Sequence, residues 1–349
     1  MKIAIDCRMI GSGGIGSYLL ALLPFFIKNH DCLLFGNEEN IKSYVSSSDC
    51  RILSCDVSTF SIKELISFPK SLIKEINCCD IYYSPYCNIP SGIKIPVYST
   101  IHDVVFLDVP GLSGKIGTIA RKWFYQHAYN KSKVVFTVSE FSKSRIQKHL
   151  KIRKVPTIVT YNAIPYWFTE NIDKNVQKDN SILFVGNIKK HKGLSTLLSA
   201  FSKLLDEKLD AKLVIVGNAN NFRTGDVSIA DKISKLPQDR VEFTGRVSDL
   251  QLKNYYQKAR ILVQPSLYEG FGMPPMEALV LGTNAVISDI PVFKEIYAKL
   301  PVTFFQTENS DDLADKIKNT FNKTNPVISE NPYSFDRTYE IINNTIQGK

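Results

Sequence analysis

The sequence predicts an α/β fold built from two doubly wound parallel sheets, and two observations carry that prediction. Short apolar runs rich in Ile, Val, Leu, Phe and Tyr recur along the chain, separated by segments with helical periodicity. Such runs are typical of parallel strands that are covered on both faces. The chain of 349 residues, 44% of them hydrophobic, is also long enough for about two domains of ordinary size.

Twelve of these runs are predicted as strands. They span residues 2–7, 32–35, 81–83, 97–101, 134–138 and 157–161, and then 182–185, 212–216, 241–243, 261–263, 285–287 and 302–305. The alternation lapses at residues 163–180, which are polar, interrupted by Pro165 and without either period. We therefore expect a first domain at 1–162, a linker at 163–180, a second domain at 181–330, and a helix at 331–349 that can cross back to the first domain.

Composition argues against several protein classes. No stretch of 18 uncharged apolar residues occurs and no basic leader precedes the first apolar run, so we expect a cytoplasmic location. The seven cysteines all lie within the first 87 residues and form no C-x-x-C pair, which predicts reduced, buried thiols and no zinc site. No nucleic-acid-binding module is present, so we expect no nucleic-acid partner.

The net charge of +9 is concentrated in one segment. From Lys115 to Lys154 the chain has eleven Lys or Arg residues and one acidic residue, Glu140. Three aromatic residues lie beside two basic ones within it, namely Trp123, Phe124, Tyr125, Arg121 and Lys122. This segment suits an anionic surface on the inner face of the cytoplasmic membrane or a polyanionic substrate, and an ordinary solvated basic face is the alternative.

Near the N-terminus, residues 11–16 (GSGGIG) match G-x-G-x-x-G, the phosphate-binding fingerprint of dinucleotide-binding proteins. In those proteins the strand runs directly into the first glycine, whereas residues 6–10 intervene here. Glu38 and Glu39 stand where a ribose-binding acid is expected, but they fall in a predicted loop. We therefore interpret the glycines as a permissive loop that approaches a phosphate through Gly14 and Gly16, with an NAD oxidoreductase as the weaker alternative.

The most informative stretch is residues 264–282, QPSLYEGFGMPPMEALVLG. It follows a strand, forms a loop with glycines, and enters a helix through two prolines, where a missing N–H costs nothing. Backbone amides at a helix start favour an anion. Glu269 in the loop and Glu277 in the first helical turns are natural acceptors for sugar hydroxyls. Together these features indicate a site for a nucleotide sugar.

The same stretch, with E-x7-E inside S-L-Y-E-G-F-G-x-P-x-x-E-A, resembles the signature of the retaining GT-B glycosyltransferases of group 1. It is nearest in pattern to bacterial mannosyl- and rhamnosyltransferases of surface polysaccharide synthesis. The resemblance implies two Rossmann-like domains that face each other across a cleft. It also implies that Glu269, Gly270, Phe271 and Gly272 contact the donor sugar and phosphate, and that Glu277 holds the ribose.

Other positions are similar to the same family. Lys192 and Gly193 match its diphosphate-binding G-R-x4-K-G pattern, but Asn187 stands at the arginine position. Three neighbours are candidates for the missing positive charge, namely Lys189, Lys190 and protonated His191. The loop from Gly245 to Val247 corresponds to the family's base-packing loop.

In the first half of the chain, His102 stands at the end of a predicted strand and matches the family histidine that contacts the donor sugar near the reacting carbon. Asp103 is expected to orient His102 or to approach the acceptor hydroxyl. Ser139, in a V-S-x-x-S turn, is expected to cap a helix.

The resemblance implies transfer of a hexose from a nucleotide diphosphate sugar, of GDP-mannose or dTDP-rhamnose type, to a saccharide or polyprenyl-diphosphate-linked saccharide. No D-x-D triplet occurs, so we expect no metal or other cofactor, with Lys192, helix dipoles and amides stabilising the leaving diphosphate. A nucleotide-sugar epimerase of the same architecture is the alternative enzyme, and a sugar-binding protein without catalysis is a further alternative.

Overall fold

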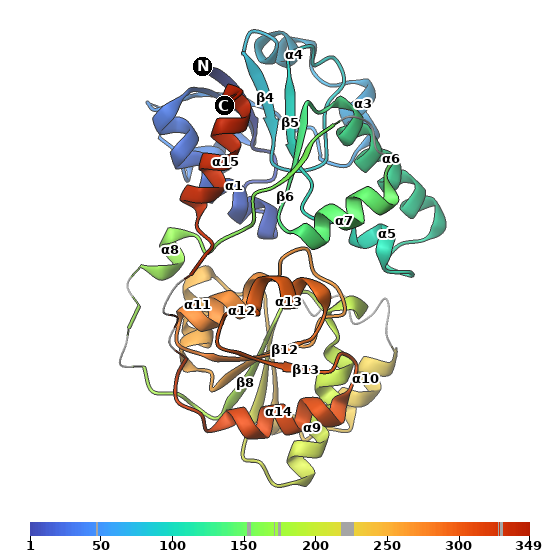
Figure 1. The fold of residues 1–349 in the computed structure, drawn as a ribbon, viewed down its shortest axis with the longest axis vertical. Coiled ribbons are helices and arrows are strands. Elements are labelled where there is room, and N and C mark those ends of the chain that lie inside the picture. Colours follow the sequence, from blue (N-terminus) through green and yellow to red (C-terminus); the bar gives the residue numbers. More distant parts are fainter. Residues whose placement is uncertain are drawn as a thin grey trace. The chain divides into compact units, whose positions relative to one another are not determined.

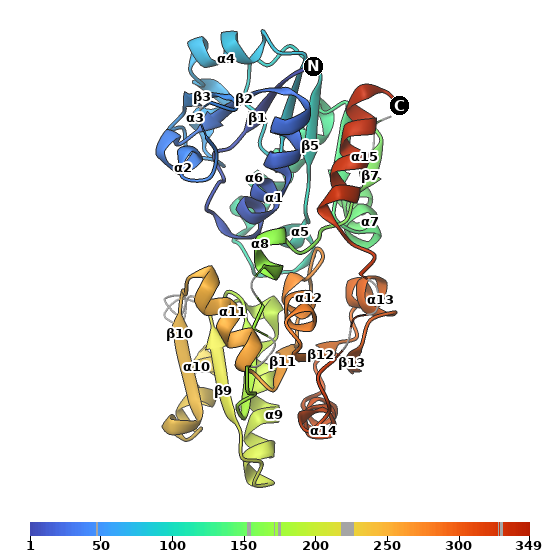
Figure 2. The ribbon, with the colours of Figure 1, turned by 90° about the vertical axis from the view of Figure 1, so that its left-hand side faces the viewer.

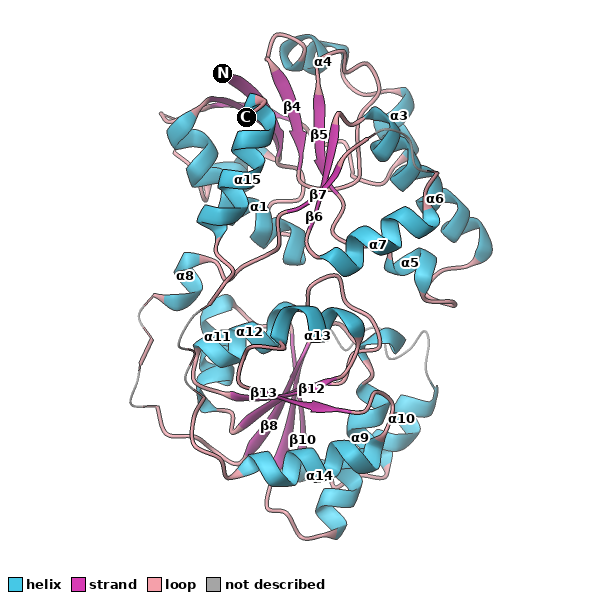
Figure 3. Ribbon diagram, in the orientation of Figure 1, coloured by secondary structure: helices cyan, strands magenta, loops and turns pink. Residues whose placement is uncertain are grey.

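The computed structural model describes residues 1–349 except 47, 152–154, 171, 174–175, 218–226, 327 and 329–330. The chain divides into two compact units, one made of Met1–Pro165 with Tyr333–Lys349 and the other of Tyr166–Pro332. Each unit is a parallel sheet flanked by helices (Figure 1, Figure 3). Every one of the twelve runs predicted as a strand contains a strand, so the prediction of two α/β sheets is confirmed.

In the described residues, the sheet of the first unit has seven strands in the order β3-β2-β1-β4-β5-β6-β7. They are β1 (Lys2–Asp6), β2 (Asp31–Gly36), β3 (Arg51–Ser54), β4 (Ile81–Ser84), β5 (Val97–Thr100), β6 (Val134–Thr137) and β7 (Thr157–Val159). The helices are α1 (Gly13–Asn29), α2 (Glu38–Lys42), α3 (Ile62–Ile66), α4 (Lys70–Ile76), α5 (Val105–Asp108), α6 (Lys115–Lys131), α7 (Glu140–His149) and α15 (Phe335–Gln347). Strand β3 was not predicted, because it is a half-exposed edge strand without a continuous apolar run.

The sheet of the second unit has six described strands in the order β10-β9-β8-β11-β12-β13. They are β8 (Ser181–Val185), β9 (Lys212–Val216), β10 (Val241–Gly245), β11 (Ile261–Gln264), β12 (Asn284–Ser288) and β13 (Val302–Phe305). The helices are α8 (Tyr166–Thr169), α9 (Leu194–Asp206), α10 (Val227–Ser234), α11 (Asp249–Lys258), α12 (Met273–Val280), α13 (Pro291–Tyr297) and α14 (Ser310–Phe321), with short 3-10 turns η1 (Lys190–Lys192) and η3 (Gln238–Arg240).

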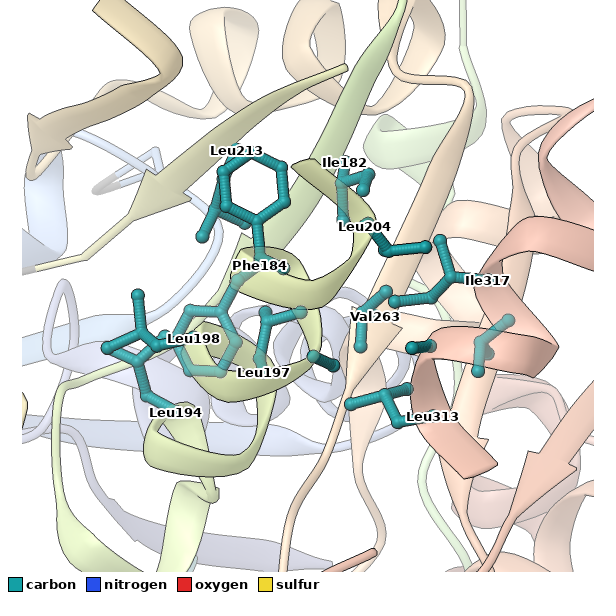
Figure 4. Close-up of a cluster of buried hydrophobic side chains, with 14 of the residues drawn as sticks. Ile182, Phe184, Leu194, Leu197, Leu198, Leu204, Leu213, Val263, Leu313 and Ile317 are labelled. Atoms are coloured by element: carbon teal, nitrogen blue, oxygen red, sulfur yellow. The ribbon is translucent and has the colours of Figure 1, made fainter. Parts of the chain in front are cut away.

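The core of the second unit explains why α9 lies on the sheet. Its buried side chains recur at helical spacing, with Leu194, Leu197, Leu198, Phe201 and Leu204 on one face. Figure 4 shows this face against the apolar side chains of β8 and α14. Burial of one leucine side chain contributes about 2 kcal/mol to stability. The buried face of α9 therefore holds the helix on the sheet and fixes the position of its start, directly after η1.

The C-terminal helix α15 belongs to the first unit and lies beside α1 (Figure 2). Its Tyr339 ring stacks on Phe25, with 5.3 Å between ring centroids. The Thr338 hydroxyl donates to the Thr160 carbonyl at 3.0 Å. Apolar stacking and a buried hydrogen bond therefore attach the end of the chain to the unit that contains its beginning.

Residues 163–180, predicted as a linker, contain a short helix. Residues Tyr166–Thr169 form helix α8, which clusters with the second unit. Phe168 is buried with its ring 6.0 Å from that of Tyr256. The Lys253 ammonium donates to the Glu170 carbonyl. Phe168 is the buried residue of α8, and one buried residue leaves no period in the sequence.

Two further expectations can be compared with the structure. Glu38 and Glu39 open helix α2 instead of lying in a loop, because the Asn37 side chain caps that helix by accepting from the Asn40 amide at 2.9 Å. All seven cysteines are free, and five of them are buried, namely Cys7, Cys32, Cys55, Cys79 and Cys87. Among the described residues, no helix combines the length and apolar character needed to cross a membrane.

Candidate functional site

The predicted site residues of the second unit follow strands β8, β10 and β11, at the carboxyl edge of the sheet. Lys192 comes after β8 and Glu269 after β11. These two strands are neighbours, and the winding of the sheet reverses between them. Open α/β sheets bind ligands at such a switch point, so the topology alone places Lys192 and Glu269 where a ligand is expected.

The Lys192 ammonium donates to both carboxylate oxygens of Glu269, at 2.7 Å and 2.8 Å. Glu269 also accepts from the Ser266 hydroxyl at 2.8 Å and from the Gln264 amide at 3.3 Å. Burial by itself would raise the pKa of the Glu269 carboxyl, but the charge of Lys192 and these hydrogen bonds outweigh burial and lower the pKa. Glu269 is therefore an ionised carboxylate that is only 9% exposed.

Backbone contacts also join the loop that carries Lys192 to the loop that carries Glu269. The Leu267 amide donates to the His191 carbonyl at 2.7 Å. Gly193 has a left-handed φ of 69°, and a Cβ at this position would lie 1.8 Å from the Pro265 carbonyl oxygen. Only glycine fits so close an approach, and this explains why the lysine is followed by glycine.

The loop before α12 rests on α13. Gly272 has a φ of 84°, and a Cβ there would lie 2.3 Å from a ring carbon of Phe293. The Tyr297 hydroxyl donates to the Gly272 carbonyl. Gly270 and Phe271 in the same loop are buried. The eight-residue helix α12 starts directly after this loop, so its positive dipole end lies beside Glu269 and favours an anion.

Glu277 lies in α12 and is half-buried. The Tyr256 hydroxyl donates to its Oε2 at 2.5 Å. Burial raises the pKa of the Glu277 carboxyl to about 7, and the Tyr256 hydrogen bond only partly opposes this rise. Because burial also raises the pKa of Tyr256 well above its ordinary value, Tyr256 stays a donor. Further hydrogen-bond donors to Glu277 would therefore lower its pKa and favour the ionised carboxylate.

The remaining predicted residues of this unit lie on the same edge. Asn187 is exposed two residues after β8. Gly245 ends β10, and its carbonyl accepts from the Gly217 amide at 3.1 Å. Val247 is half-buried in the loop that follows. The segment after β9, residues 218–226, lies outside the described residues.

Of the three candidates for the missing positive charge, His191 is the one that its surroundings disfavour. His191 is only 6% exposed. Burial and then the neighbouring charge of Lys192 lower the pKa of its imidazole to about 4. The ring is therefore neutral near pH 7, whereas Lys189 and Lys190 are exposed on the same turn. These two lysines remain the candidates for that charge.

In the first unit, His102 follows β5 and is held on several sides. Its Nε2 lies 2.8 Å from the Pro85 carbonyl oxygen, which makes Nε2 the protonated nitrogen. The Tyr18 ring meets the imidazole edge-on at 4.8 Å. The Ser142 hydroxyl donates to the His102 carbonyl at 2.9 Å. Burial lowers the pKa of His102 to about 4, so the ring is a neutral hydrogen-bonding group.

Two residues near His102 have local structural roles. Asp103 accepts from the Val105 amide at 3.0 Å, which turns the chain into α5. The prediction that Ser139 caps a helix is confirmed, because its hydroxyl accepts from the Ser142 amide at the start of α7.

Helix α1 begins at Gly13, so Gly14 and Gly16 lie in its first turn rather than in a loop. A Cβ at Gly16 would lie 2.6 Å from the Met9 carbonyl oxygen, which explains this glycine by close packing. A Cβ at Gly14 would meet nothing within 4 Å. Gly14 is therefore the more accessible of the two predicted contacts.

A buried charged network at the ends of β1 and β4 was not predicted from the sequence. The Arg8 guanidinium donates to Asp6 at 2.6 Å and to Glu64 at 2.5 Å, and both acids are fully buried. The Tyr82 and Tyr86 hydroxyls donate to Asp6 at 3.0 Å and 2.9 Å. An acid and an arginine directly after an apolar strand were the available signal. The network fixes the chain that leads into residues 9–16.

Within the part of the chain that the structure describes, no group of three or more His, Cys, Asp or Glu side chains is arranged to hold a metal ion. At the carboxyl edge of the second sheet, Lys192 and the start of α12 attract anions.

Comparison with known proteins gives a match to each half of the chain. Residues 167–330 match the family described as Glycosyl transferases group 1, and residues 12–166 match Glycosyltransferase Family 4. The chain is 31% identical over 198 residues to the O-antigen chain mannosyltransferase RfbU of Salmonella typhimurium, covering 56% of this chain and 53% of RfbU. It is 25% identical over 229 residues to the O-antigen chain mannosyltransferase B of Escherichia coli, covering 62% and 58%. The match thus spans about half the length of these relatives.

Among solved structures, Anabaena HepE in complex with UDP and glucose superimposes with a TM-score of 0.74 at 15% identity, covering all of both chains. Sucrose-phosphate synthase from Thermosynechococcus elongatus does so with a TM-score of 0.68 at 16% identity, covering 100% of this chain and 98% of the synthase. At this level of identity the likeness concerns the fold, which is that of the GT-B glycosyltransferases.

Proposed function

We propose that the chain is a glycosyltransferase of group 1, the family whose model matches residues 167–330, and that it transfers a hexose from a nucleotide diphosphate sugar to a saccharide or lipid-linked saccharide, with retention of anomeric configuration. The observation that carries this proposal is the Lys192–Glu269 pair at the switch point of the second sheet. A cation for phosphate and an ionised carboxylate for hydroxyl groups stand side by side there.

In this proposal, the bound donor replaces hydrogen bonds that Lys192 and Glu269 make with each other. Lys192 exchanges a Glu269 oxygen for a diphosphate oxygen, and the start of α12 supports the same anion. Glu269 then accepts hydrogen bonds from the sugar hydroxyls. Glu277 accepts from the two ribose hydroxyls in addition to Tyr256.

The neighbouring loops complete the proposed donor site. Asn187 and the two exposed lysines of η1 and its flank lie on the phosphate side, and Gly245 and Val247 pack the base. Gly270, Phe271 and Gly272 hold the loop that carries Glu269 and face sugar and phosphate. The resemblance to the family implies these assignments, and the shared carboxyl edge of the three strands supports them.

The chemical step forms one bond and breaks one. The acceptor hydroxyl oxygen bonds to the anomeric carbon, and the bond from that carbon to the diphosphate oxygen breaks with its electron pair leaving on the diphosphate. The acceptor proton passes to the departing diphosphate. Lys192 stabilises the negative charge that develops on this leaving group.

In the first unit, we assign His102 a role at the donor sugar. Its pKa of about 4 means that it acts as a neutral hydrogen-bonding group and not as an acid. Asp103 is assigned to the acceptor hydroxyl, and Gly14 and Gly16 to the approach of a phosphate.

The kind of donor is proposed from the relatives. Two of them are named as O-antigen chain mannosyltransferases, which favours a GDP-mannose or dTDP-rhamnose type of donor and an acceptor in bacterial surface polysaccharide synthesis. We further propose that no metal is required, because Lys192 and the α12 dipole supply positive charge at the diphosphate. Activity that is unchanged by EDTA is the expected result.

The proposal is tested with the purified full chain. A thermal-shift panel of nucleotide sugars identifies the donor, and product analysis with saccharide acceptors measures transfer and anomeric configuration. We expect Glu269→Gln and Lys192→Met to lose transfer by at least about a hundredfold, since each removes charge stabilisation at the reacting centre. The control is Lys318→Met, which removes an exposed lysine paired with Glu207. Wild-type turnover by Lys192→Met would contradict the assignment.

A further inference from the structure

Helix α6 of the first unit exposes an apolar stripe to solvent. Ile116 is 85% exposed, Ile119 is 70% exposed and Trp123 is 50% exposed. Residues at i, i+3 and i+7 lie on one face of a helix. The side chains that α6 buries lie elsewhere around it, namely Tyr125, Ala128 and Tyr129. One face of α6 therefore packs on the unit, and another presents large apolar side chains to water.

The stripe has a basic flank. Lys115 and Lys122 are exposed and lie seven residues apart, so they share one side of the helix beside the stripe. The chain contains no acidic residue between Asp108 and Glu140. Asp108 itself accepts from Arg145 Nε at 2.7 Å and lies 2.6 Å from Nε2 of His149. The nearest preceding carboxylate in the sequence is thus occupied by basic partners.

An aromatic pair extends the apolar surface. The Phe60 ring lies 6.4 Å from that of Phe124, and Phe124 meets Trp123 edge-on at 5.4 Å. Phe60 is 48% exposed. The apolar surface therefore includes the loop before α3 as well as α6.

We propose that this face of α6, defined by Ile116, Ile119, Trp123, Lys115 and Lys122, docks on an anionic lipid bilayer. The isoleucines and the indole enter the boundary between headgroups and acyl chains, and the lysine ammonium groups contact the headgroup phosphates. An amphipathic helix with aromatic and aliphatic residues on one side and lysines beside them binds an interface in this way. The inference goes beyond sugar transfer and does not depend on it.

The structure changes the surface that the sequence suggested. Tyr125 is buried and takes no part. The Arg121 guanidinium lies over the Phe106 ring at 4.1 Å, so it serves packing within the unit. Lys154 lies outside the described residues. The docking face is therefore narrower than the basic segment and contains isoleucines that the charge count did not indicate.

Charge also favours a lipid bilayer over a second copy of the chain as the partner of this α6 face. A two-fold symmetric contact through this stripe would bring the lysines of both copies together, and the stripe carries no acidic side chain of its own to compensate them. Like charges at an interface disfavour association. Anionic headgroups supply the missing complement.

Tryptophan fluorescence gives a direct test. The chain has two tryptophans, so Trp167→Phe leaves Trp123 as the sole indole. We expect its emission to shift to the blue with vesicles of phosphatidylcholine mixed with phosphatidylglycerol, and to shift little with phosphatidylcholine alone. No shift with the anionic vesicles would overturn the proposal.

Co-sedimentation with the same vesicles tests the residues. Lys115→Glu and Lys122→Glu are each expected to lower the partition coefficient at least about fivefold, since one basic charge near an anionic surface contributes about that factor. Ile119→Ser is expected to weaken binding as well. The controls are Leu250→Ser, at a site 78% exposed on α11, and Lys235→Glu on the second unit. Equal losses in the controls would contradict the assignment to α6.

Two further measurements separate this proposal from the others. Glu269→Gln is expected to bind vesicles as the wild type does, so a failure of the proposed transfer chemistry leaves membrane docking measurable. Sedimentation equilibrium without lipid is expected to show no self-association that Ile119→Ser abolishes. Such a dimer would assign the stripe to a second copy and overturn the proposal.

Discussion

The Lys192 ammonium contacts both carboxylate oxygens of Glu269, at 2.7 Å and 2.8 Å, from a loop that follows a different strand. The two groups proposed to bind diphosphate and sugar thus neutralise each other when no donor is bound. Glu269 is buried, so a carboxylate without this partner would be costly. An incoming diphosphate therefore competes with Glu269 for Lys192, and the sugar hydroxyls compensate Glu269.

This pairing predicts a non-additive effect on stability. Lys192→Met leaves the Glu269 carboxylate buried without its cation and is expected to lower the free energy of unfolding by about 3 kcal/mol. In the double variant Lys192→Met/Glu269→Gln no unpaired charge remains, so most of that loss is recovered. Urea unfolding of the wild type, Lys192→Met, Glu269→Gln and the double variant measures the coupling energy between the two residues. Strictly additive losses would show that the pair contributes no specific interaction.

Glu277 predicts a pH dependence of donor binding. Its pKa of about 7 means that the carboxyl is mostly protonated near pH 6 and mostly ionised near pH 8. Ribose hydroxyls donate to the ionised form, so binding favours deprotonation and the affinity for the donor rises with pH across this window. The expected gain is up to about tenfold between about pH 6 and about pH 8.

Calorimetric titration of donor binding across this range checks the sign. Glu277→Gln removes the titrating group and is expected to flatten the profile while weakening binding at the higher pH. A wild-type affinity that falls as pH rises would contradict the assignment of Glu277 to the ribose.

The close approach of Gly193 to Pro265 predicts that activity depends on backbone contact between the two loops. In Gly193→Ala the new Cβ would overlap the Pro265 carbonyl, so the η1 turn must move away and Lys192 must leave Glu269. Loss of transfer by at least about a hundredfold is expected, because misplacement of a positioned group by about 1 Å costs that much.

A matched control exists for this substitution. Gly282 has a φ of 73°, close to the 69° of Gly193, but a Cβ there would meet nothing within 4 Å. Gly282→Ala therefore introduces the same backbone strain without the collision. If both variants lost activity equally, strain and not loop contact would be responsible.

The sequence predicted the sheets because parallel strands that are buried on both faces leave continuous apolar runs. It failed at β3, whose residues are half-exposed, and at α8, which a single buried Phe168 anchors to its unit. Edge strands and short anchored segments bury too few side chains to produce a pattern. Lys192 and Glu269 could be identified from the sequence because each lies in a contiguous motif that resembles a family signature.

Contacts between distant segments could not be predicted in this way. Nothing in the sequence places Tyr256 against Glu277, or the Leu267 amide against the His191 carbonyl. The choice among Lys189, Lys190 and protonated His191 stayed open in the sequence because charge depends on burial, and burial depends on the packing of both loops. The exposed isoleucines of α6 look like core residues in the sequence, and only their position on the folded unit shows otherwise.

The lowered pKa values of His102 and His191 predict an acid-sensitive fold. The pKa of His102 and that of His191 are each lowered to about 4, chiefly by burial, whereas an unfolded histidine titrates near 6.5. The unfolded chain therefore binds more protons below about pH 6.5, so stability is fully present above that pH and is lost as the pH falls toward about 4. The loss approaches about 3 kcal/mol for each histidine. Urea unfolding at a series of pH values measures this slope, which His191→Gln should reduce. An unchanged slope in that variant would show that His191 is already charged in the folded protein.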